Sequence, residues 1–189
     1  PMSIESPLDN HEINITGTLN VLEAARAAGA RHVVLASSAA VYGNEPTVPK
    51  REDMLTSPVS PYALAKLACE HYAAVFARVY ALRTVSLRYF NVFGPRQDPS
   101  SVYSGVISRF VSAASAGEKP TVYGDGLQTR DFVFVRDVVR ANIMALRNPA
   151  LGHGEVFNVG TGVQTSLLDL LACLADITGQ DCSPLFADA

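Results

Sequence analysis

Apolar residues in the first part of the chain recur first at helical and then at extended spacing. Within residues 10–29, Ile15, Leu19 and Leu22 lie on one helical face, which predicts an amphipathic helix. Residues 32–37 then form a short apolar run rich in β-branched side chains, which predicts a buried strand. Because a helix leads into this run, we expect the strand to belong to a parallel sheet.

A polar segment with several prolines separates this strand from a second helix and strand. Residues 43–60 predict a long loop, and ordered loops of this length are often functional. Ser60 is a favoured N-cap residue and Pro61 suits the first helical position, so we expect a helix from there to about Ala81. A second buried strand is predicted over residues 84–93.

Shorter elements follow in the second half of the chain. The order helix, strand, helix, strand before residue 94 predicts a parallel sheet with right-handed crossovers. We therefore interpret residues 1–94 as part of a doubly wound α/β domain and residues 95–189 as mostly a smaller substrate-side region, with an approximate boundary. In the second half, helices are predicted over 105–116, 136–147 and 166–178, and strands over 120–123, 131–135 and 155–159.

The composition excludes several classes of partner. The 189 residues are 48% hydrophobic and 17% charged, which is typical of a globular protein with a sizeable core. The net charge of −3 gives no basic field for nucleic acid or an anionic membrane surface, and no apolar run reaches the length of a bilayer span. We therefore expect neither a nucleic acid nor a membrane as a partner.

The cysteine pattern favours reduced thiols. Cys69, Cys173 and Cys182 form no CxxC pair and lack the spacing of metal ligands, which predicts a cytoplasmic protein without a metal site. The first residues, from Pro1 to Glu5, resemble the interior of a protein rather than its start. We therefore expect the sequence to be a portion of a longer protein.

The most specific chemical signal is a tyrosine and a lysine four residues apart. Tyr62 and Lys66 share a face of the predicted helix, and Ser37 and Ser38 end the first predicted strand. A free phenol has a pKa of ~10, which a neighbouring ammonium group lowers by favouring the phenolate. Tyr62 could then accept a proton from a substrate hydroxyl whose oxygen Ser38 holds by a hydrogen bond.

A tyrosine and a lysine at this spacing also occur by chance, usually as a packed tyrosine and a solvated lysine. Here the pair accompanies two serines at a strand end, a long loop, a capped helix and a following buried strand. The combination favours the catalytic interpretation.

Five motifs occur in order along the chain: NITGT at 14–18, SSAAVYG at 37–43, SPYALAK at 60–66, LRYFNVFG at 87–94 and GDGLQTRDF at 124–132. Together they resemble the UDP-sugar 4-epimerases of the extended short-chain dehydrogenase/reductase superfamily, within its NAD-dependent epimerase/dehydratase family. The likeness is greatest to the UDP-glucose and UDP-N-acetylglucosamine 4-epimerases. It implies a Rossmann-like doubly wound parallel sheet whose N-terminal strands are absent from this sequence, a smaller α/β substrate-binding region, NAD as cofactor and a UDP-sugar as substrate.

The resemblance also implies roles for single residues at the cofactor. Ser38, Tyr62 and Lys66 match the family's catalytic triad, and Lys66 would also bond the nicotinamide ribose. Asn14 and Phe90 would lie beside the cofactor. The alternative for Asn14 is a cap of its own helix backbone, and for Phe90 a place in the core.

A further set of residues is implied at the substrate. Asn91 and Arg130 would contact the diphosphate, since a planar guanidinium suits phosphate oxygens. The alternative for Arg130 is a surface ion pair with Asp131, and the apolar or aromatic members of the set could be ordinary core residues. The implied substrate-binding residues are Ser38, Tyr62, Asn91, Val106, Tyr123 and Arg130.

Two alanines bear on which reaction the family resemblance implies. Related dehydratases and decarboxylases carry acidic residues after the serine at the strand end, where this chain has Ala39 and Ala40. Because neither alanine can donate a proton, we expect a 4-epimerase that works through a transient 4-keto sugar. The alternatives are another NAD(P)-dependent nucleotide-sugar enzyme, such as a reductase or a 4,6-dehydratase, and a non-catalytic homologue that binds nucleotide sugar or NAD.

The glycine-rich turn that binds the cofactor pyrophosphate in this family is absent from the sequence. The stretch Val159-Gly160-Thr161-Gly162 resembles it in part, but it lacks the third glycine and the following βαβ unit. We interpret it as a tight turn in the substrate-side region.

The predicted helix that carries Tyr62 has a second apolar face. This stripe lies largely opposite Tyr62 and Lys66, so the helix is expected to be covered on both sides. The stripe could pack within its own chain, but the family commonly dimerises through this helix, and we expect a two-fold homodimer. Its members are Leu64, Ala68, Tyr72, Val75 and Val79.

Overall fold

The computed structural model describes residues 2–101 and 105–188, which form two compact units. The first unit contains Pro1–Phe90 and Asp137–Val159, and the second contains Asn91–Arg136 and Gly160–Ala189. The domain limits at residues 94 and 95 stay a prediction.

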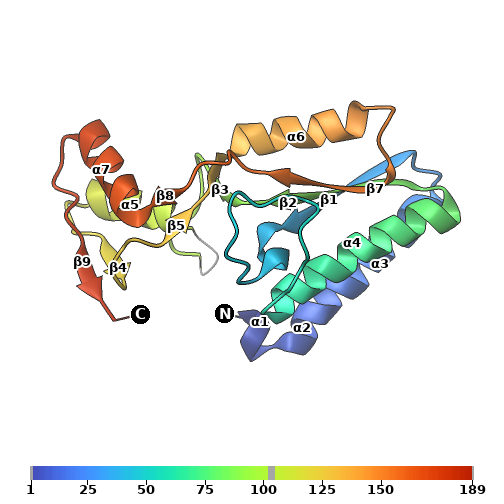
Figure 1. Ribbon diagram of the computed structural model, residues 1–189, viewed down its shortest axis with the longest axis horizontal. Helices are drawn as coiled ribbons and strands as arrows, with labels where there is room; N and C mark the ends of the chain where they lie inside the picture. The colour runs from blue at the N-terminus through green and yellow to red at the C-terminus, as the bar shows by residue number, and fades with distance from the viewer. Residues whose placement is uncertain (1, 102–104, 189) are drawn as a thin grey trace. The chain divides into compact units, whose positions relative to one another are not determined.

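A parallel sheet forms the centre of the first unit (Figure 1). Its strands lie in the order β1-β2-β7, with Ser38 opposite Tyr89 and Tyr89 opposite Val159. The carboxyl ends of all three strands therefore meet at one edge, which is where α/β sheets place ligand-binding groups. The predicted Rossmann-like α/β class is confirmed. The bounds are His32–Ser38 for β1, Arg83–Tyr89 for β2 and His153–Val159 for β7.

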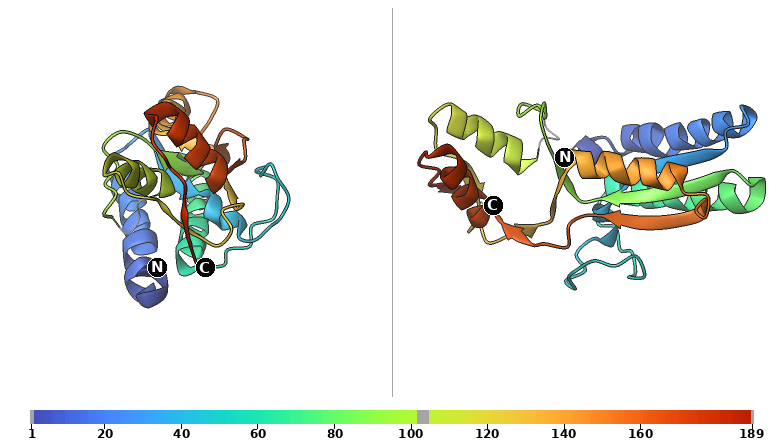
Figure 2. Two further views of the ribbon diagram at one scale, coloured as in Figure 1. Left: turned by 90° about the vertical axis from the view of Figure 1, so that its left-hand side faces the viewer. Right: turned by 90° about the horizontal axis from the view of Figure 1, so that it is seen from above.

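Helices cover both faces of this sheet. Figures 1 and 2 show α3 and α4 on one face and α6 on the other. The buried side chains Leu22, Phe76 and Leu82 join α3, α4 and the start of β2 in one apolar cluster. The bounds are Gly17–Ala27 for α3, Pro61–Tyr80 for α4 and Val135–Arg147 for α6.

Helix α4 begins as its sequence predicts. The Ser60 side chain accepts a hydrogen bond from the backbone N–H of Ala63 (3.2 Å), and Pro61 occupies the first turn. Further along the helix, Ala74 packs directly against β7. A Cβ added to Gly154 would lie 2.6 Å from the Ala74 Cα, and Gly154 has a φ of +89°. Only glycine therefore allows this approach of helix and strand.

The sequence prediction was wrong in two details of the first unit. The predicted helix over 10–29 starts earlier and is irregular: α1 (Met2–Glu5), α2 (Pro7–His11) and a π-helical turn (Glu12–Thr16) precede α3. The predicted strand over 84–93 is two strands, β2 and β3, in different sheets. Phe90 N–H still donates to Val159 O (3.1 Å), whereas Asn91 N–H donates to Asp131 O (3.0 Å). The chain thus changes its pairing partner within one residue.

The described residues of the second unit form short strand pairs and two helices. Its core contains Phe110, Ala114, Val122, Leu167, Leu171 and Cys182. The pairs β3-β6 and β4-β9 are parallel and β5-β8 is antiparallel. The bounds are Asn91–Phe93 for β3, Thr121–Tyr123 for β4, Thr129–Arg130 for β5, Phe132–Phe134 for β6, Thr165–Ser166 for β8, Leu185–Ala187 for β9, Val106–Ser115 for α5 and Leu167–Thr178 for α7.

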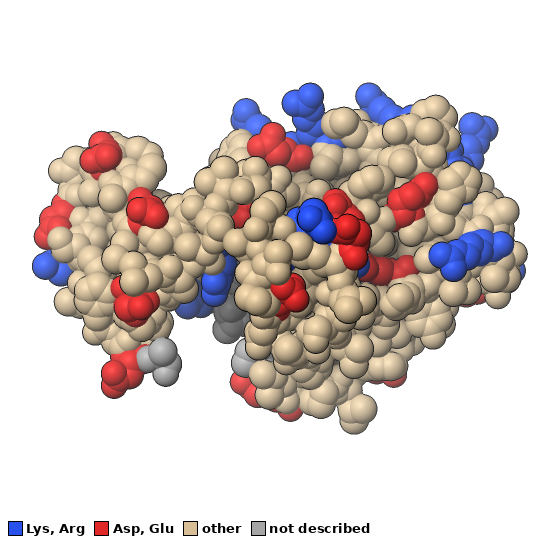
Figure 3. All heavy atoms as spheres, in the orientation of Figure 1, with Lys and Arg blue, Asp and Glu red and all other residues tan. Residues whose placement is uncertain are grey.

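Charged side chains of both signs are interspersed on the face shown in Figure 3, and basic ones gather along α6, which carries Arg136, Arg140 and Arg147. No helix within the described ranges combines the length and apolarity needed to cross a bilayer. The described part of the chain also contains no group of three or more His, Cys, Asp or Glu that could hold a metal ion.

Candidate functional site

Ser38 lies at the carboxyl edge of the parallel sheet. It is the last residue of β1, and a 3₁₀ turn over Ala39–Tyr42 follows it. Its Oγ accepts a hydrogen bond from the Ala40 N–H (3.2 Å), and the side chain is half-buried. A hydroxyl is thereby held at the strand end, where a ligand of the sheet would lie.

Tyr62 and Lys66 meet on the first turns of α4. The Lys66 Nζ lies 5.7 Å from the centre of the Tyr62 ring, and Tyr62 is 38% exposed. The same ammonium group donates to Ala36 O on β1 (3.0 Å), two residues before Ser38. The lysine therefore joins the helix to the strand end and brings a positive charge beside the phenol.

The N–H donors of the Lys66 ammonium group fit the hydroxyls of the nicotinamide ribose of NAD. An ammonium group has three donors, and Ala36 O is the one hydrogen-bond acceptor that the described residues offer to it. Two donors therefore remain for ribose hydroxyls. Tyr62 is partly exposed and Ser38 is half-buried, and the catalytic roles of all three residues stay predictions.

Asn14 and Phe90 also lie in the first unit. The Asn14 Nδ2 donates to Asn10 O and Asn10 Oδ1 (both 3.1 Å), so its amide bonds the preceding turn of its own helix. Its carbonyl accepts from Cys69 Sγ on α4 (3.2 Å). The π-helical turn that contains Asn14 is a feature frequently found at functional sites. Phe90 is half-buried between β2 and β3. Their roles at the cofactor stay predictions.

A buried ion pair lies one helical turn beyond Lys66. Glu70 accepts from Arg88 at Nε (2.9 Å) and at a terminal nitrogen (2.8 Å), and the two side chains are 4% and 6% exposed. Burial alone would lower the pKa of the Arg88 guanidinium, but its hydrogen bonds to Glu70 and Tyr42 outweigh burial and raise that pKa above its usual value. This pair was not predicted from the sequence. The available signal was Glu70 itself, a carboxylate on the same helical face as Lys66.

The glycine-containing turn after β7 holds a carboxylate of its own chain. Thr161 and Gly162 donate their backbone N–H groups to the Asp131 carboxylate (2.8–2.9 Å), and the Thr161 hydroxyl adds a third donor (2.7 Å). These groups are therefore engaged and do not form a phosphate cradle. This agrees with the interpretation of the stretch as a tight turn.

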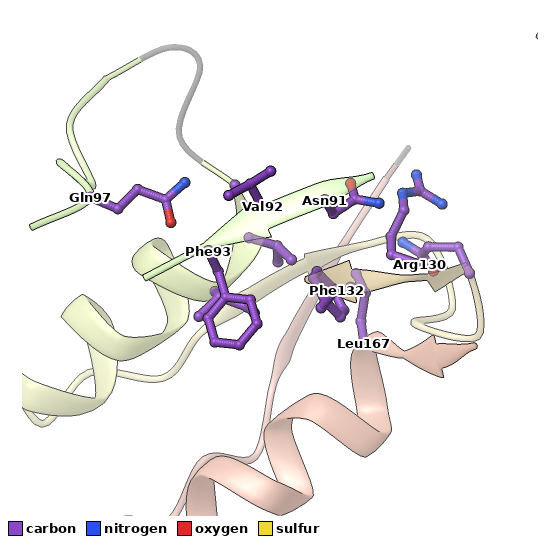
Figure 4. A pocket seen from close by; sticks show the side chains of 11 residues that line it. Asn91, Val92, Phe93, Gln97, Arg130, Phe132 and Leu167 are labelled. Atoms are coloured by element: carbon purple, nitrogen blue, oxygen red, sulfur yellow. The ribbon is translucent and has the colours of Figure 1, made fainter. Parts of the chain in front are cut away.

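The second unit contains a pocket of about 170 Å³. Three predicted substrate residues, Asn91, Val106 and Arg130, line it together, whereas Tyr123 is 60% exposed on β4 and is not among the lining residues. Figure 4 shows polar side chains on two sides, with Gln97 on one and Asn91 and Arg130 on the other. The lining residues are Asn91, Val92, Phe93, Gln97, Gly105, Val106, Ile107, Gln128, Arg130, Phe132 and Leu167.

Arg130 is exposed and available to an anion. One terminal nitrogen donates to Thr129 O (2.8 Å), while the Asp131 carboxylate is occupied by the turn at Thr161. No ion pair between Arg130 and Asp131 occurs among the described residues, so the surface-pair alternative does not form. Gln128 also lines the pocket, but it was not predicted as a site residue from the sequence. In an extended segment it shares a face with Arg130, two residues later, and that spacing was the available signal.

Comparison with known proteins identifies close relatives over nearly the whole chain. The UDP-glucose 4-epimerase of Mycolicibacterium smegmatis is 44% identical over 185 residues, which cover 97% of this chain and 58% of that protein. Two solved structures superimpose closely. The UDP-N-acetylglucosamine 4-epimerase from Methanobrevibacter ruminantium, in complex with UDP-N-acetylmuramic acid, has a TM-score of 0.95 at 39% identity. The UDP-glucose 4-epimerase from Thermotoga maritima, with UDP-glucose, has a TM-score of 0.93 at 39% identity.

These relatives are longer than the present chain. The two superpositions cover 100% and 99% of this chain but 60% of each solved chain. Residues 1–160 match the NAD dependent epimerase/dehydratase family. The matched region includes β1, α4 and β2, and with them Ser38, Tyr62 and Lys66. The resemblance predicted from the motifs is confirmed, and this chain belongs to the NAD dependent epimerase/dehydratase family.

Proposed function

We propose that the protein containing this chain is a UDP-sugar 4-epimerase that uses NAD. The observation that carries the proposal is the position of Lys66, whose ammonium group lies beside the Tyr62 ring and donates to β1 just before Ser38. A phenol, an ammonium group and a hydroxyl gathered at the carboxyl edge of a parallel sheet suit the removal of a proton from a sugar hydroxyl.

Each of these three side chains has a distinct task in the proposed reaction. Tyr62, as phenolate, accepts the proton of the sugar C4 hydroxyl, and Lys66 stabilises that phenolate through its charge. The Ser38 hydroxyl bonds the C4 oxygen and orients it toward Tyr62. When bound, NAD would supply the acceptor for the C4 hydride and the donor for its return to the other face of the 4-keto sugar. Tyr62 then gives the proton back to the same oxygen.

The residues after Ser38 favour an epimerase over a dehydratase. Ala39 and Ala40 form the turn that follows β1, and neither side chain can donate or accept a proton. A dehydratase needs acid and base groups to eliminate water from the keto sugar. With none at these positions, return of the hydride to C4 is the outcome that the side chains support best.

The substrate class is inferred from the polar lining of the pocket and from the relatives. Asn91, Gln128 and Arg130 supply amide and guanidinium donors, which match diphosphate oxygens. The two similar solved structures hold UDP-glucose and UDP-N-acetylmuramic acid. We therefore propose UDP-glucose and UDP-galactose, or their N-acetyl forms, as substrates.

The test of this function is interconversion of UDP-galactose and UDP-glucose by the full-length protein, followed by chromatography of the sugar nucleotides. We expect both directions to proceed without net formation of reduced cofactor. A stable 4-keto-6-deoxy product would instead establish a 4,6-dehydratase, and net oxidation or reduction a dehydrogenase. Binding of UDP-sugar without any turnover would favour a non-catalytic homologue.

Replacing Arg130 with Met is expected to raise the KM for the UDP-sugar by about 10- to 100-fold, with a smaller effect on kcat. The reason is the loss of charge-assisted hydrogen bonds to phosphate oxygens, which are worth roughly 1.5–3 kcal/mol. Steady-state kinetics would measure the change. Arg140→Met, which removes an exposed arginine from α6, is the matched control and should leave the KM unchanged. If both variants had the same KM for the UDP-sugar, Arg130 would not be a residue that binds the substrate diphosphate.

We further propose a homodimer through α4. Its stripe is exposed in the isolated chain, with Leu64 57%, Val75 46% and Val79 65% exposed. An apolar stripe of this length on one helix favours a self-complementary contact about a two-fold axis.

Replacing Leu64 and Val75 with Lys together is expected to convert the dimer to a monomer, because four added charges would face one another across the axis. Size-exclusion chromatography with light scattering would measure the mass. Leu55→Lys, in a loop position that is 90% exposed, is the control and should leave the mass unchanged. A monomeric unmodified protein would refute the dimer.

A further inference from the structure

A row of polar side chains crosses the parallel sheet one residue before the carboxyl edge at which Ser38 lies. Ser37 on β1 lies opposite Arg88 on β2, and Arg88 lies opposite Asn158 on β7. Ser37 is directly followed by Ser38. Because neighbours in a row are fixed by the strand register, this row forms a rigid base behind the Ser38 hydroxyl.

Glu70 connects this row to α4. Its Oε1 accepts hydrogen bonds from the Ser37 hydroxyl and from Arg88, and its Oε2 accepts a second bond from Arg88 (2.8 Å). Glu70 lies one helical turn after Lys66 and two turns after Tyr62. One buried carboxylate therefore ties the strand that ends in Ser38 to the helix that carries Tyr62 and Lys66.

The same row continues to the turn and the loop beyond β1. Arg88 donates to the Tyr42 hydroxyl (2.9 Å), which donates to Asn158 Oδ1 (2.8 Å). Tyr42 closes the turn that starts after Ser38 and is fully buried. Asn158 in turn holds the long loop, since it donates from Nδ2 to Lys50 O (3.1 Å) and its N–H donates to the Glu52 carboxylate (2.7 Å). Figure 2 shows this loop extending away from the sheet.

We propose that Ser37, Glu70 and Arg88 are positioning residues that set the placement of Ser38 relative to Tyr62 and Lys66. This inference rests on the proposed epimerase function. Proton transfer needs donor and acceptor atoms within hydrogen-bond reach, and a misplacement of about 1 Å can cost roughly 10²-fold in rate. The three residues are at most 5% exposed, so they act through the placement of β1 against α4.

The alternative is that the row only stabilises the fold. A second buried hydrogen bond offers a direct comparison: the Thr84 hydroxyl on β2 donates to Ala73 O on α4 (2.8 Å), and Thr84 is fully buried. It joins the same helix to the same face of the sheet, but at the end of the strands away from Ser38. Loss of either bond should cost similar stability, whereas only loss of the Ser37 bond should disturb the site.

The experiment compares Ser37→Ala with Thr84→Val in the full-length enzyme, using UDP-galactose as substrate. We expect Ser37→Ala to lower kcat by about tenfold with the KM and the bound NAD content unchanged. Thr84→Val should leave kcat within about twofold of the unmodified enzyme at a similar fall in Tm. Ser37→Thr, which keeps the hydroxyl, should restore most of the lost kcat.

The outcomes separate this inference from the function on which it rests. Suppose that the unmodified enzyme is active. If both variants then lose kcat equally, or if Ser37→Ala changes only the Tm, the positioning role is overturned and the epimerase proposal stays intact. Unmodified enzyme without UDP-sugar turnover overturns the proposed function and the inference together. A selective fall in kcat that Ser37→Thr restores supports the inference.

Discussion

Replacing Tyr62 with Phe is expected to lower kcat for UDP-sugar epimerisation by about 10³-fold, because general acid–base catalysis contributes roughly 10²–10⁴ to such rates. The ring and its contact with Lys66 remain in the variant, so only the ionisable oxygen is lost. The affinity for the UDP-sugar should therefore change little. Steady-state kinetics would measure the first effect and calorimetry the second.

Tyr80 provides the matched control for this substitution. It lies at the end of the same helix, is 44% exposed and packs against Phe76 and Arg26. Tyr80→Phe removes a phenol oxygen from α4 without touching the site, so kcat should not change. If Tyr62→Phe retained more than about a tenth of the original kcat, Tyr62 would not be the proton acceptor.

The helix that carries Tyr62 could be predicted because its signals are local. Ser60 and Pro61 determine where it begins, and the four-residue spacing determines that Tyr62 and Lys66 share a face. The end of β1 at Ser38 likewise follows from a short apolar run. The proposed catalytic constellation therefore depends on two segments whose patterns span fewer than about ten residues each.

The parts that the sequence did not predict depend on pairing between distant segments. In the sequence, Phe90 and Asn91 look like parts of one continuous strand. In the structure they separate because β2 pairs with β7, whereas β3 pairs with β6. The strands β5, β8 and β9 contain two or three residues, too few for periodicity to be recognised. Glu70 and Arg88 are 18 residues apart in the sequence. They meet only because of the register of the sheet and the packing of α4 on it, which a local sequence pattern does not reveal.

The Glu70–Arg88 pair also carries the largest expected effect on stability. Replacing Glu70 alone with Leu should lower the free energy of unfolding by about 3–5 kcal/mol, because it leaves the buried Arg88 guanidinium without its counter-charge. The double variant Glu70→Leu with Arg88→Met should recover most of this loss, since apolar side chains of similar volume often replace a buried pair at little cost. Chemical denaturation of the full-length protein would measure both.

An exposed ion pair gives the control for this comparison. Arg51 and Asp53 bond at 3.0 Å, but their side chains are 67% and 71% exposed, so Asp53→Leu should scarcely change stability. If the Glu70 single variant and the double variant were equally unstable, uncompensated charge would not be the cause of the loss. Because the double variant removes the buried Ser37–Glu70 bond between β1 and α4, it should remain slow in turnover even where its stability is recovered. Stability and catalysis would then separate at one buried pair, which is the behaviour that a positioning role requires.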